Sequence, residues 1–334
     1  MNSMQAARLD TMLNRLSLQS VDIPEPSANE VRVKVAYAGI CLSDIHFISG
    51  ETAADMLGEV TLGHEVAGFV DKIGDAVTDW QVGDRVLVHP VEDFGTSTRI
   101  LGVHYDGGWA QQVVAPAESL VALGPDLSFE TAAIIPDAVA VPWAAIRETA
   151  KVQPTESVAV WGLGGLGFHA VKLLRLIGAV PIIAVDPLEA ARERALDAGA
   201  DIALDPRSDD FQEQIRTITR GKGLNVALDF FGHSSIHQQA FDALGRNGRL
   251  VLVGIPNTPL SLETTPKLIR GAKKILGHYG PEKKHAEEIV KLVHLGRLDL
   301  SDSISAVYDL ADAHQAVDHL TTKTDNPIRI LLKP

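Results

Sequence analysis

Two neighbouring regions in the first 65 residues carry side chains that could bind a transition metal. Cys41 is the only cysteine among 334 residues, and His64 is followed directly by Glu65. A thiolate and an imidazole are good zinc ligands, and a carboxylate can complete such a set. Taken alone, a cysteine is more often a small buried hydrophobe and a histidine a hydrogen-bonded structural residue. The sequence around Cys41 and His64 is therefore needed to distinguish a metal site from a structural role.

A second group of residues, in the stretch 157–186, has the pattern of a dinucleotide-binding turn. A short apolar run is followed by three glycines at G-x-G-x-x-G spacing and then by a helical pattern. The first glycine permits a tight turn, the second lets a pyrophosphate approach, and the third lets the helix lie close to the strand. The helix then points free N–H groups at the phosphates. The candidate loop residues are Gly162, Gly164, Gly165, Leu166 and Gly167. A glycine-rich turn in an unrelated parallel sheet is the alternative interpretation.

The next apolar run ends in Asp186, and this residue indicates which dinucleotide would bind. A carboxylate there can accept both ribose hydroxyls of adenosine and would repel a 2′-phosphate, so it favours NAD over NADP. Arg192 and Arg194 lie nearby and could meet a phosphate, so we include Arg192 among the candidate cofactor residues. Gly254 and Ile255 follow another apolar run, at the kind of strand end where such sheets bind ligands.

The elements that would position these residues fall into two patterns. Residues 1 to about 135 are mainly of β type, with Val31, Val33 and Val35 alternating with polar residues. From about 151 to 280 strands and helices alternate, which predicts an α/β unit with a parallel sheet covered by helices on both faces. The last residues, from about 283, contain a further helix and mixed segments that we expect to return to the first domain.

Composition limits the class of protein further. The length predicts two domains, and 46% hydrophobic with 22% charged residues is typical of a soluble globular chain. We find no apolar run near the roughly 18 residues of a membrane span and no signal peptide. A net charge of −13 argues against nucleic acid as a main partner. One cysteine rules out an intrachain disulfide and fits a reducing cytoplasm.

The chain resembles the zinc-containing alcohol dehydrogenases of the medium-chain dehydrogenase/reductase superfamily. The motif is Gly63-His64-Glu65-(two)-Gly68-(five)-Gly74-(two)-Val77, and Cys41-Leu42-Ser43-Asp44 is similar to that family's first zinc-ligand segment. The resemblance covers nearly the whole chain. It implies a GroES-like, mainly-β catalytic domain of residues 1–138, completed by 283–334, and a Rossmann NAD-binding domain of residues 139–282.

The resemblance also implies a set of metal ligands. Cys41 matches the first ligand of the catalytic zinc and His64 the second. Asp137 falls at the place of the third ligand, which is usually cysteine and sometimes acidic. Glu65 matches a carboxylate near zinc that coordinates transiently or helps ligand exchange. For Asp137 the alternative is a cap of a helix that begins near Val139.

Three further residues have catalytic roles by the same resemblance. Asp44 matches a carboxylate that orients the metal-bound histidine, Ser43 the hydroxyl that takes the alcohol proton, and His46 the residue that relays it toward solvent. A surface histidine is the alternative for His46. Zinc as a Lewis acid lowers the pKa of a bound alcohol, and a hydride then passes to the nicotinamide. The implied function is reversible conversion of an alcohol to an aldehyde or ketone with NAD, by a homo-oligomer (dimer or tetramer).

One departure from the family bears on metal content. Many members hold a second, structural zinc with four cysteines, and Cys41 alone cannot supply them. We therefore expect one zinc per chain and a solvated loop at residues 92–108. Two other functions remain open at this point. One is a zinc-free, NADPH-dependent quinone or enoyl reductase of the same superfamily, and the other is a non-catalytic cofactor-binding protein.

Overall fold

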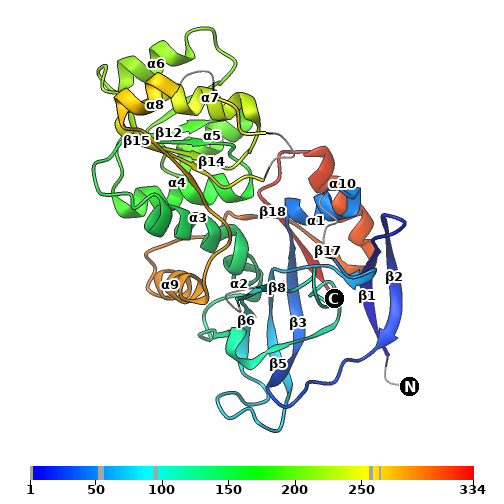
Figure 1. Cartoon of the computed structure of the whole chain (residues 1–334). Helices are drawn as coiled ribbons and strands as arrows, with labels where there is room; N and C mark the ends of the chain where they lie inside the picture. The colour runs from blue at the N-terminus through cyan, green and yellow to red at the C-terminus, as the bar shows by residue number, and fades with distance from the viewer. Residues whose placement is uncertain (1–2, 52–55, 94–96, 256–258, 263–264) are drawn as a thin grey trace. The chain divides into compact units, whose positions relative to one another are not determined.

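The computed structural model describes residues 3–51, 56–93, 97–255, 259–262 and 265–334. The chain divides into two compact units (Figure 1). The first unit contains Met1–Ala140 together with Pro281–Pro334, and the second contains Val141–Gly280. The C-terminal segment therefore belongs to the same unit as the N-terminal one.

The first unit is built on sheets whose strands pair antiparallel, except for the parallel pair β17–β18. The strands of its main sheet are β3 (Glu30–Ile40), β5 (Val66–Ile73), β6 (Arg85–Val88), β9 (Gln112–Pro116), β10 (Leu120–Ala122), β17 (Ile304–Asp309) and β18 (Arg329–Lys333). They run in the order β10-β6-β5-β3-β18-β17, with β9 also pairing with β3. A smaller sheet contains β1 (Ser3–Asp10), β2 (Arg15–Asp22) and β4 (Glu59–Thr61).

The strand β3 lies at the centre of this unit because its alternating valines form one side of the core. Val31, Val33 and Val35 are buried, as the alternation in the sequence predicts. Trp109 is buried in the same core and donates its indole N–H to the carbonyl of Gly39, at 3.0 Å. β3 pairs with β5 on one side and with the C-terminal strand β18 on the other. The two ends of the sequence thus share one hydrophobic core.

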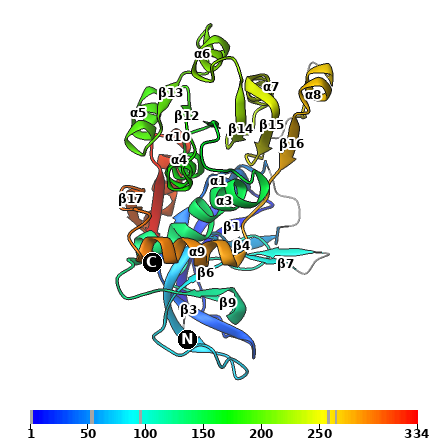
Figure 2. The same cartoon turned by 90° about the vertical axis from the view of Figure 1, so that its left-hand side faces the viewer.

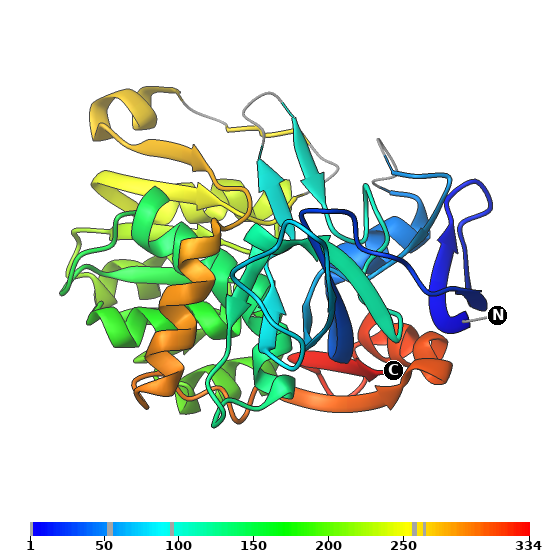
Figure 3. The ribbon, with the colours of Figure 1, turned by 90° about the horizontal axis from the view of Figure 1, so that it is seen from below.

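Helices cover this sheet at several points. They are α1 (Leu42–Ser49), α2 (Phe129–Ile134), the 3-10 turn η4 (Leu310–Asp312), α9 (Lys283–His294) and α10 (Ala313–Thr322). α1 and α10 contact one another, and α9 contacts β10 and the helical turn at 135–139 (Figure 3). The C-terminal helices therefore pack against the N-terminal part of this unit.

The second unit is a parallel sheet of strands connected by helices. The strands are β11 (Val158–Trp161), β12 (Ile182–Val185), β13 (Ile202–Leu204), β14 (Leu224–Asp229), β15 (Leu244–Leu252) and β16 (Lys274–Gly277). Their order is β13-β12-β11-β14-β15-β16, and all neighbouring pairs are parallel (Figure 2). The strand order reverses between β11 and β14, so ligands are expected at the carboxyl ends of these strands. The predicted doubly wound sheet is confirmed.

Each face of this sheet is covered by helices whose apolar residues meet it. On one face α6 (Phe211–Ile218) and α7 (Ser234–Ala243) pack against Trp161 and Ile183. On the other face α4 (Gly165–Ile177) lies close to Val160, because Gly167 carries no side chain. The remaining helices are α5 (Glu189–Asp197) and α8 (Thr265–Gly271). α5 contacts β12 and β13, and α8 contacts β15.

One sequence-based expectation differs from the structure. Residues 92–108 were expected to form a solvated loop, but β7 (Val91–Asp93) pairs with β8 (Thr98–Ile100), and Glu92 is buried. A second segment bears on the expectation that the chain has no membrane span. The continuous helix Phe129–Thr149 has the length and composition to cross a membrane, although 83% of its most apolar window is buried inside the protein. Such burial is typical of a core helix of a folded domain.

The glycines at the start of α4 give a test of this packing. A Cβ on Gly167 would lie 1.8 Å from the carbonyl oxygen of Gly162, whereas a Cβ on Gly164 would meet nothing within 4 Å. We expect Gly167→Ala to lower the free energy of unfolding by about 1–3 kcal/mol, because the helix must move away from the strand. Gly164→Ala should change it by less than about 0.5 kcal/mol. Urea denaturation followed by circular dichroism measures both, and equal stabilities would contradict the close packing.

Candidate functional site

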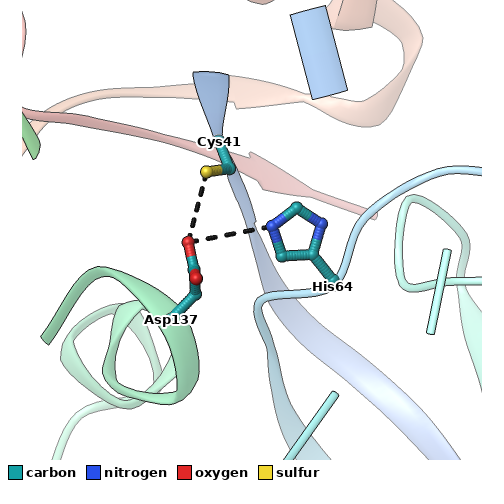
Figure 4. Close-up of side chains that lie close together, drawn as sticks. All are labelled: Cys41, His64 and Asp137. Carbon is teal, nitrogen blue, oxygen red and sulfur yellow. Dashed lines mark hydrogen bonds and ion pairs between the residues drawn. The ribbon is translucent and has the colours of Figure 1, made fainter. Parts of the chain in front are cut away.

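Three side chains of types that can bind a metal converge in the first unit (Figure 4). The Cys41 thiol donates to Asp137 Oδ2 at 3.2 Å, and His64 Nε2 lies 3.8 Å from the same oxygen. One ligand atom of each residue lies within 4.8 Å of the other two. Sulfur, nitrogen and carboxylate oxygen donors at this spacing suit a tetrahedral zinc ion with one position left open. The residues present therefore fit the metal that the sequence pattern implies.

Each of the three ligands comes from a different element. Cys41 follows β3 directly and is the N-cap of α1, and His64 lies between β4 and β5. Asp137 lies inside the π-helical turn Ile135–Val139 of the long helix. It is not the cap of a helix beginning near Val139, so the alternative interpretation of Asp137 is wrong. The site therefore forms only when the sheet and the helix are packed together.

Asp44 connects two of these ligands. Its Oδ2 accepts the backbone N–H of Cys41 at 2.8 Å, and its Oδ1 lies 3.3 Å from Nδ1 of His64. The side chain of Asp44 is completely buried. A carboxylate on Nδ1 fixes the orientation of the ring and leaves Nε2 to face Cys41 and Asp137. This is the arrangement that the sequence predicts for Asp44.

The charges of this cluster shift the pKa values of its members. Burial by itself would lower the pKa of His64, but Asp44 and Asp137 raise it above its ordinary value. Burial and the nearby Asp137 carboxylate raise the pKa of the Cys41 thiol. Burial opposes ionisation of Asp137, yet His64 and Arg329 hold the pKa of this carboxyl well below its usual range.

Glu65 faces an arginine that the sequence analysis missed. Arg329, on β18, places its Nη2 atom 3.2 Å from Glu65 Oε1 and 3.6 Å from Asp137 Oδ2, and both Glu65 and Arg329 are buried. Glu65 is not one of the three converging ligands, although it lies next to His64 in sequence. Burial raises the pKa of Glu65 to about 8, with Arg329 opposing this shift and Asp137 adding to it. Arg329 could have been identified in the sequence as a charged residue inside the apolar run 328–332.

The two expected proton-transfer residues both lie on α1. Ser43 Oγ is 3.3 Å from Nε2 of His64, which places its hydroxyl next to the metal ligands. His46 lies one helical turn further and is partly buried. Among the described residues no hydrogen bond joins Ser43 to His46 directly. The structure thus brings Ser43 to the ligand cluster and places His46 on the same helix.

The second unit carries the glycine turn at the carboxyl end of β11. Gly162 has a φ of 83°, which is the left-handed region that favours glycine, and Gly164 is the N-cap of α4. The space beside Gly164 is open, since a Cβ there would contact nothing. An open backbone cradle in front of a helix N-terminus is a suitable site for a pyrophosphate. Gly165, Leu166 and Gly167 form the first turn of this helix.

Asp186 lies beside this turn but is already engaged. Its Oδ2 accepts the N–H of Leu163 and its Oδ1 the N–H of Leu188, both at 2.9 Å. Arg192 donates to the backbone carbonyl of Asp186 at 2.8 Å. Each carboxylate oxygen has a second lone pair, so Asp186 keeps acceptor capacity for a ribose.

The other two expected cofactor residues follow β15. Gly254 comes within contact distance of Gly232, where a Cβ on Gly254 would lie 2.7 Å from the Gly232 nitrogen. The side chain of Ile255 is exposed. Both lie beyond the carboxyl end of a parallel strand, on the same edge of the sheet as the glycine turn. The structure thus places the expected cofactor residues of the second unit along one sheet edge.

Comparison with known proteins identifies the family. Residues 27–125 match the model of the alcohol dehydrogenase GroES-like domain, and residues 165–294 match that of the zinc-binding dehydrogenases. An NAD-dependent alcohol dehydrogenase of Sulfurisphaera tokodaii is 30% identical over 95% of this chain and 96% of its own length. The chain belongs to the zinc-containing medium-chain alcohol dehydrogenase family. The resemblance found in the sequence is therefore confirmed.

Solved structures of this family agree with the fold. An alcohol dehydrogenase from Escherichia coli CFT073 in complex with NADH has a TM-score of 0.92 at 25% identity, with all of both chains covered. The alcohol dehydrogenase of Aeropyrum pernix has a TM-score of 0.89 at 29% identity and covers 99% of this chain, with all of its own chain covered. The predicted combination of GroES-like and Rossmann domains is confirmed.

The segment that holds a structural zinc in many members of the family makes other contacts here. Asp106 accepts from Arg8 at 3.1 Å and from the N–H of Thr61 at 2.7 Å. His104 Nδ1 accepts the N–H of Ile100 at 3.0 Å, and the guanidinium of Arg99 lies over the ring of Tyr105. Hydrogen bonds and a cation–π contact therefore support this segment.

Zinc content tests the ligand set. We expect the wild-type protein to retain about one zinc per chain after dialysis, and Asp137→Ala to lose it, because two protein ligands hold zinc poorly. Asp137→Cys should restore retention, since it supplies the third ligand usual in the family. Elemental analysis measures the stoichiometry, and His104→Ala is the control that leaves it unchanged. Full retention by Asp137→Ala would show that Asp137 is not a ligand.

The buried Glu65–Arg329 pair predicts a large effect on stability. Arg329→Met leaves the Glu65 side chain buried without its partner, which should lower the free energy of unfolding by roughly 3–5 kcal/mol. Combining it with Glu65→Gln removes the uncompensated group and should recover part of the loss. Chemical denaturation of the single and double variants measures this coupling. Equal losses in both would mean that the two side chains do not depend on each other.

Proposed function

We propose that the protein is a zinc-dependent, NAD-linked alcohol dehydrogenase that converts alcohols to aldehydes or ketones reversibly. The observation that carries the proposal is the convergence of Cys41, His64 and Asp137 beside the hydroxyl of Ser43. The open turn at Gly164 supports a dinucleotide as the second participant. The names of the relatives, NAD-dependent alcohol dehydrogenases, support the same reaction.

The metal-binding residues have defined roles in this proposal. Cys41, His64 and Asp137 would hold one zinc ion, and three protein ligands would leave a position for the substrate oxygen. Bound zinc supplies Lewis-acid stabilisation of the negative charge on that oxygen. Asp44 keeps Nε2 of His64 directed at the metal, as its contact with Nδ1 supports. Glu65 stays on Arg329 behind the ligands in the resting state and can move between this partner and the metal.

Ser43 and His46 carry the proton. If His64 Nε2 were bound to the metal, the nearby Ser43 hydroxyl would lose that partner, and it could accept the alcohol proton while releasing its own proton to the next group. His46, one turn along α1, then passes the proton toward solvent. A positioned hydroxyl and imidazole suit this step because both can accept and donate a proton.

The cofactor site occupies the carboxyl edge of the parallel sheet. Backbone N–H groups of the first turn of α4, at Gly165 and Leu166, bind the pyrophosphate in front of Gly164. Asp186 accepts a hydroxyl of the adenosine ribose with its remaining lone pairs. Bound NAD supplies the hydride acceptor. Arg192, Gly254 and Ile255 border the same edge.

The other candidate functions fit these observations less well. A zinc-free reductase does not require three potential metal-ligand atoms within 4.8 Å of one another. A protein that only binds the cofactor does not require the Ser43 hydroxyl beside these three atoms.

We also infer a cytoplasmic location and a homo-oligomer, dimer or tetramer. The lone reduced cysteine favours the former. The terminal strand β16 of the parallel sheet favours the latter, since it could pair with a second copy. Light scattering measures the mass of the assembly.

Turnover tests the proposal directly. The zinc-loaded protein should reduce NAD with at least one member of a panel of primary, secondary and polyhydric alcohols, measured as NADH absorbance. Ser43→Ala should lower kcat about 10²–10⁴-fold while zinc content and NADH binding stay unchanged. Ser49→Ala, on the exposed end of the same helix, is the matched control. A zinc-loaded protein that binds NADH but neither oxidises any alcohol nor reduces any aldehyde or ketone would contradict the proposed reaction.

A further inference from the structure

Two arginines lie beside the carboxylate expected to bind the adenosine ribose. β13 pairs with β12, so Asp205, which follows β13, is a neighbour of Asp186, which follows β12. Arg207 donates to the carbonyl of Pro187, next to Asp186, at 2.7 Å. Arg192 donates to the carbonyl of Asp186 itself. Guanidinium groups in this position could bind a phosphate on the ribose 2′-hydroxyl.

Asp205 engages both of these guanidinium groups. Arg207 binds it through two bonds, from Nε to Oδ1 at 3.0 Å and from Nη2 to Oδ2 at 2.7 Å. Arg192 Nη1 lies 3.6 Å from the same Oδ2. The backbone N–H of Arg207 also donates to Oδ1 at 2.9 Å, which folds residues 205–207 into a turn. A forked guanidinium that already holds a carboxylate bidentately has fewer donors left for a phosphate.

The charges of the four side chains Asp186, Arg192, Asp205 and Arg207 are balanced. Asp186 and Asp205 supply two negative charges, and Arg192 and Arg207 supply two positive ones. The hydrogen bonds from Arg207 hold the pKa of Asp205 at about 2, so its carboxylate is ionised near neutral pH. A 2′-phosphate would therefore approach a group of four side chains with no net charge, in which Asp205 already accepts hydrogen bonds from Nε and Nη2 of Arg207. Removing the charge of Asp205 alone would leave a net positive group.

We propose that Asp205 is a second determinant of the preference for NAD over NADP, because it holds Arg207 and Arg192 away from a 2′-phosphate. The assignment rests on the proposed cofactor site and adds a residue to it. Asp186 disfavours NADP through its own contact with the ribose. Asp205 disfavours NADP by binding the guanidinium groups of Arg192 and Arg207. It is a positioning residue, since it acts through Arg207 and does not itself touch the cofactor.

Equilibrium binding of NADH and NADPH to the full-length protein tests this role without turnover. Asp205→Asn keeps an acceptor for the backbone N–H of Arg207 but removes the charge. We expect it to tighten NADPH binding about three- to tenfold and to change NADH binding less than about twofold. Adding Arg207→Gln to this variant should abolish the gain. Asp197→Asn, at the exposed far end of α5, removes the same charge elsewhere and should leave both affinities unchanged.

The outcomes separate this assignment from the proposed function. An unchanged ratio of NADPH to NADH affinity in Asp205→Asn, with NADH still bound, would overturn the role of Asp205 alone. A gain in NADPH affinity that survives Arg207→Gln would overturn the role of Arg207. A wild-type protein that binds neither nucleotide would overturn the proposed cofactor site, and the assignment of Asp205 with it. Retained NADH affinity in each variant also shows that the domain is folded.

Discussion

The first unit depends on how it accommodates a cluster of buried ionisable groups. The side chains of Asp44 and Glu65 are completely buried, and the Asp137 carboxylate and the Cys41 thiol lie in the same cluster. Within the described residues, Arg329 is the arginine that faces this cluster, through its contacts with Glu65 and Asp137. A buried charge without a partner is strongly destabilising. A divalent cation between Cys41, His64 and Asp137 would favour the ionised thiol and carboxylate, so metal binding would also stabilise the fold.

The fold brings these groups together by close approach of backbones. A Cβ on Gly39 would lie 1.9 Å from Glu65 Oε2, so only glycine at position 39 leaves room for the Glu65 side chain. Gly63 has a φ of 96°, and a Cβ there would lie 2.2 Å from the ring of Trp109. The tryptophan in turn donates to the carbonyl of Gly39. Gly39 and Gly63 therefore allow this close packing, and the packing sets the position of His64.

Residues that local sequence patterns identify could be predicted, whereas residues whose role depends on long-range contacts could not. The glycine turn, Asp186 and the Cys41 and His64 segments each lie within a few residues of the features that identify them, so spacing and family resemblance were sufficient. Arg329 was missed because its partner Glu65 lies in a distant part of the sequence, and the two meet through the pairing of β3 with both β18 and β5. Asp205 was missed for a similar reason, since its importance comes from the adjacency of β12 and β13. The strands β7 and β8 were missed because they are short and rich in polar residues.

The position of Asp137 has a physical origin in its helix. Pro136 lacks a backbone N–H and cannot make the regular bond to the carbonyl four residues earlier, so an α-helix is interrupted there. The chain responds with a wider turn, in which the N–H of Ala140 donates to the carbonyl of Ile135, five residues back. One extra residue in a turn rotates the following side chains relative to a regular helix, and such turns occur frequently at functional sites. Here the residue in that turn is Asp137, and it faces Cys41 and His64. The proline and the wide turn thus account for how a residue from the middle of a buried helix reaches a metal site formed by the sheet.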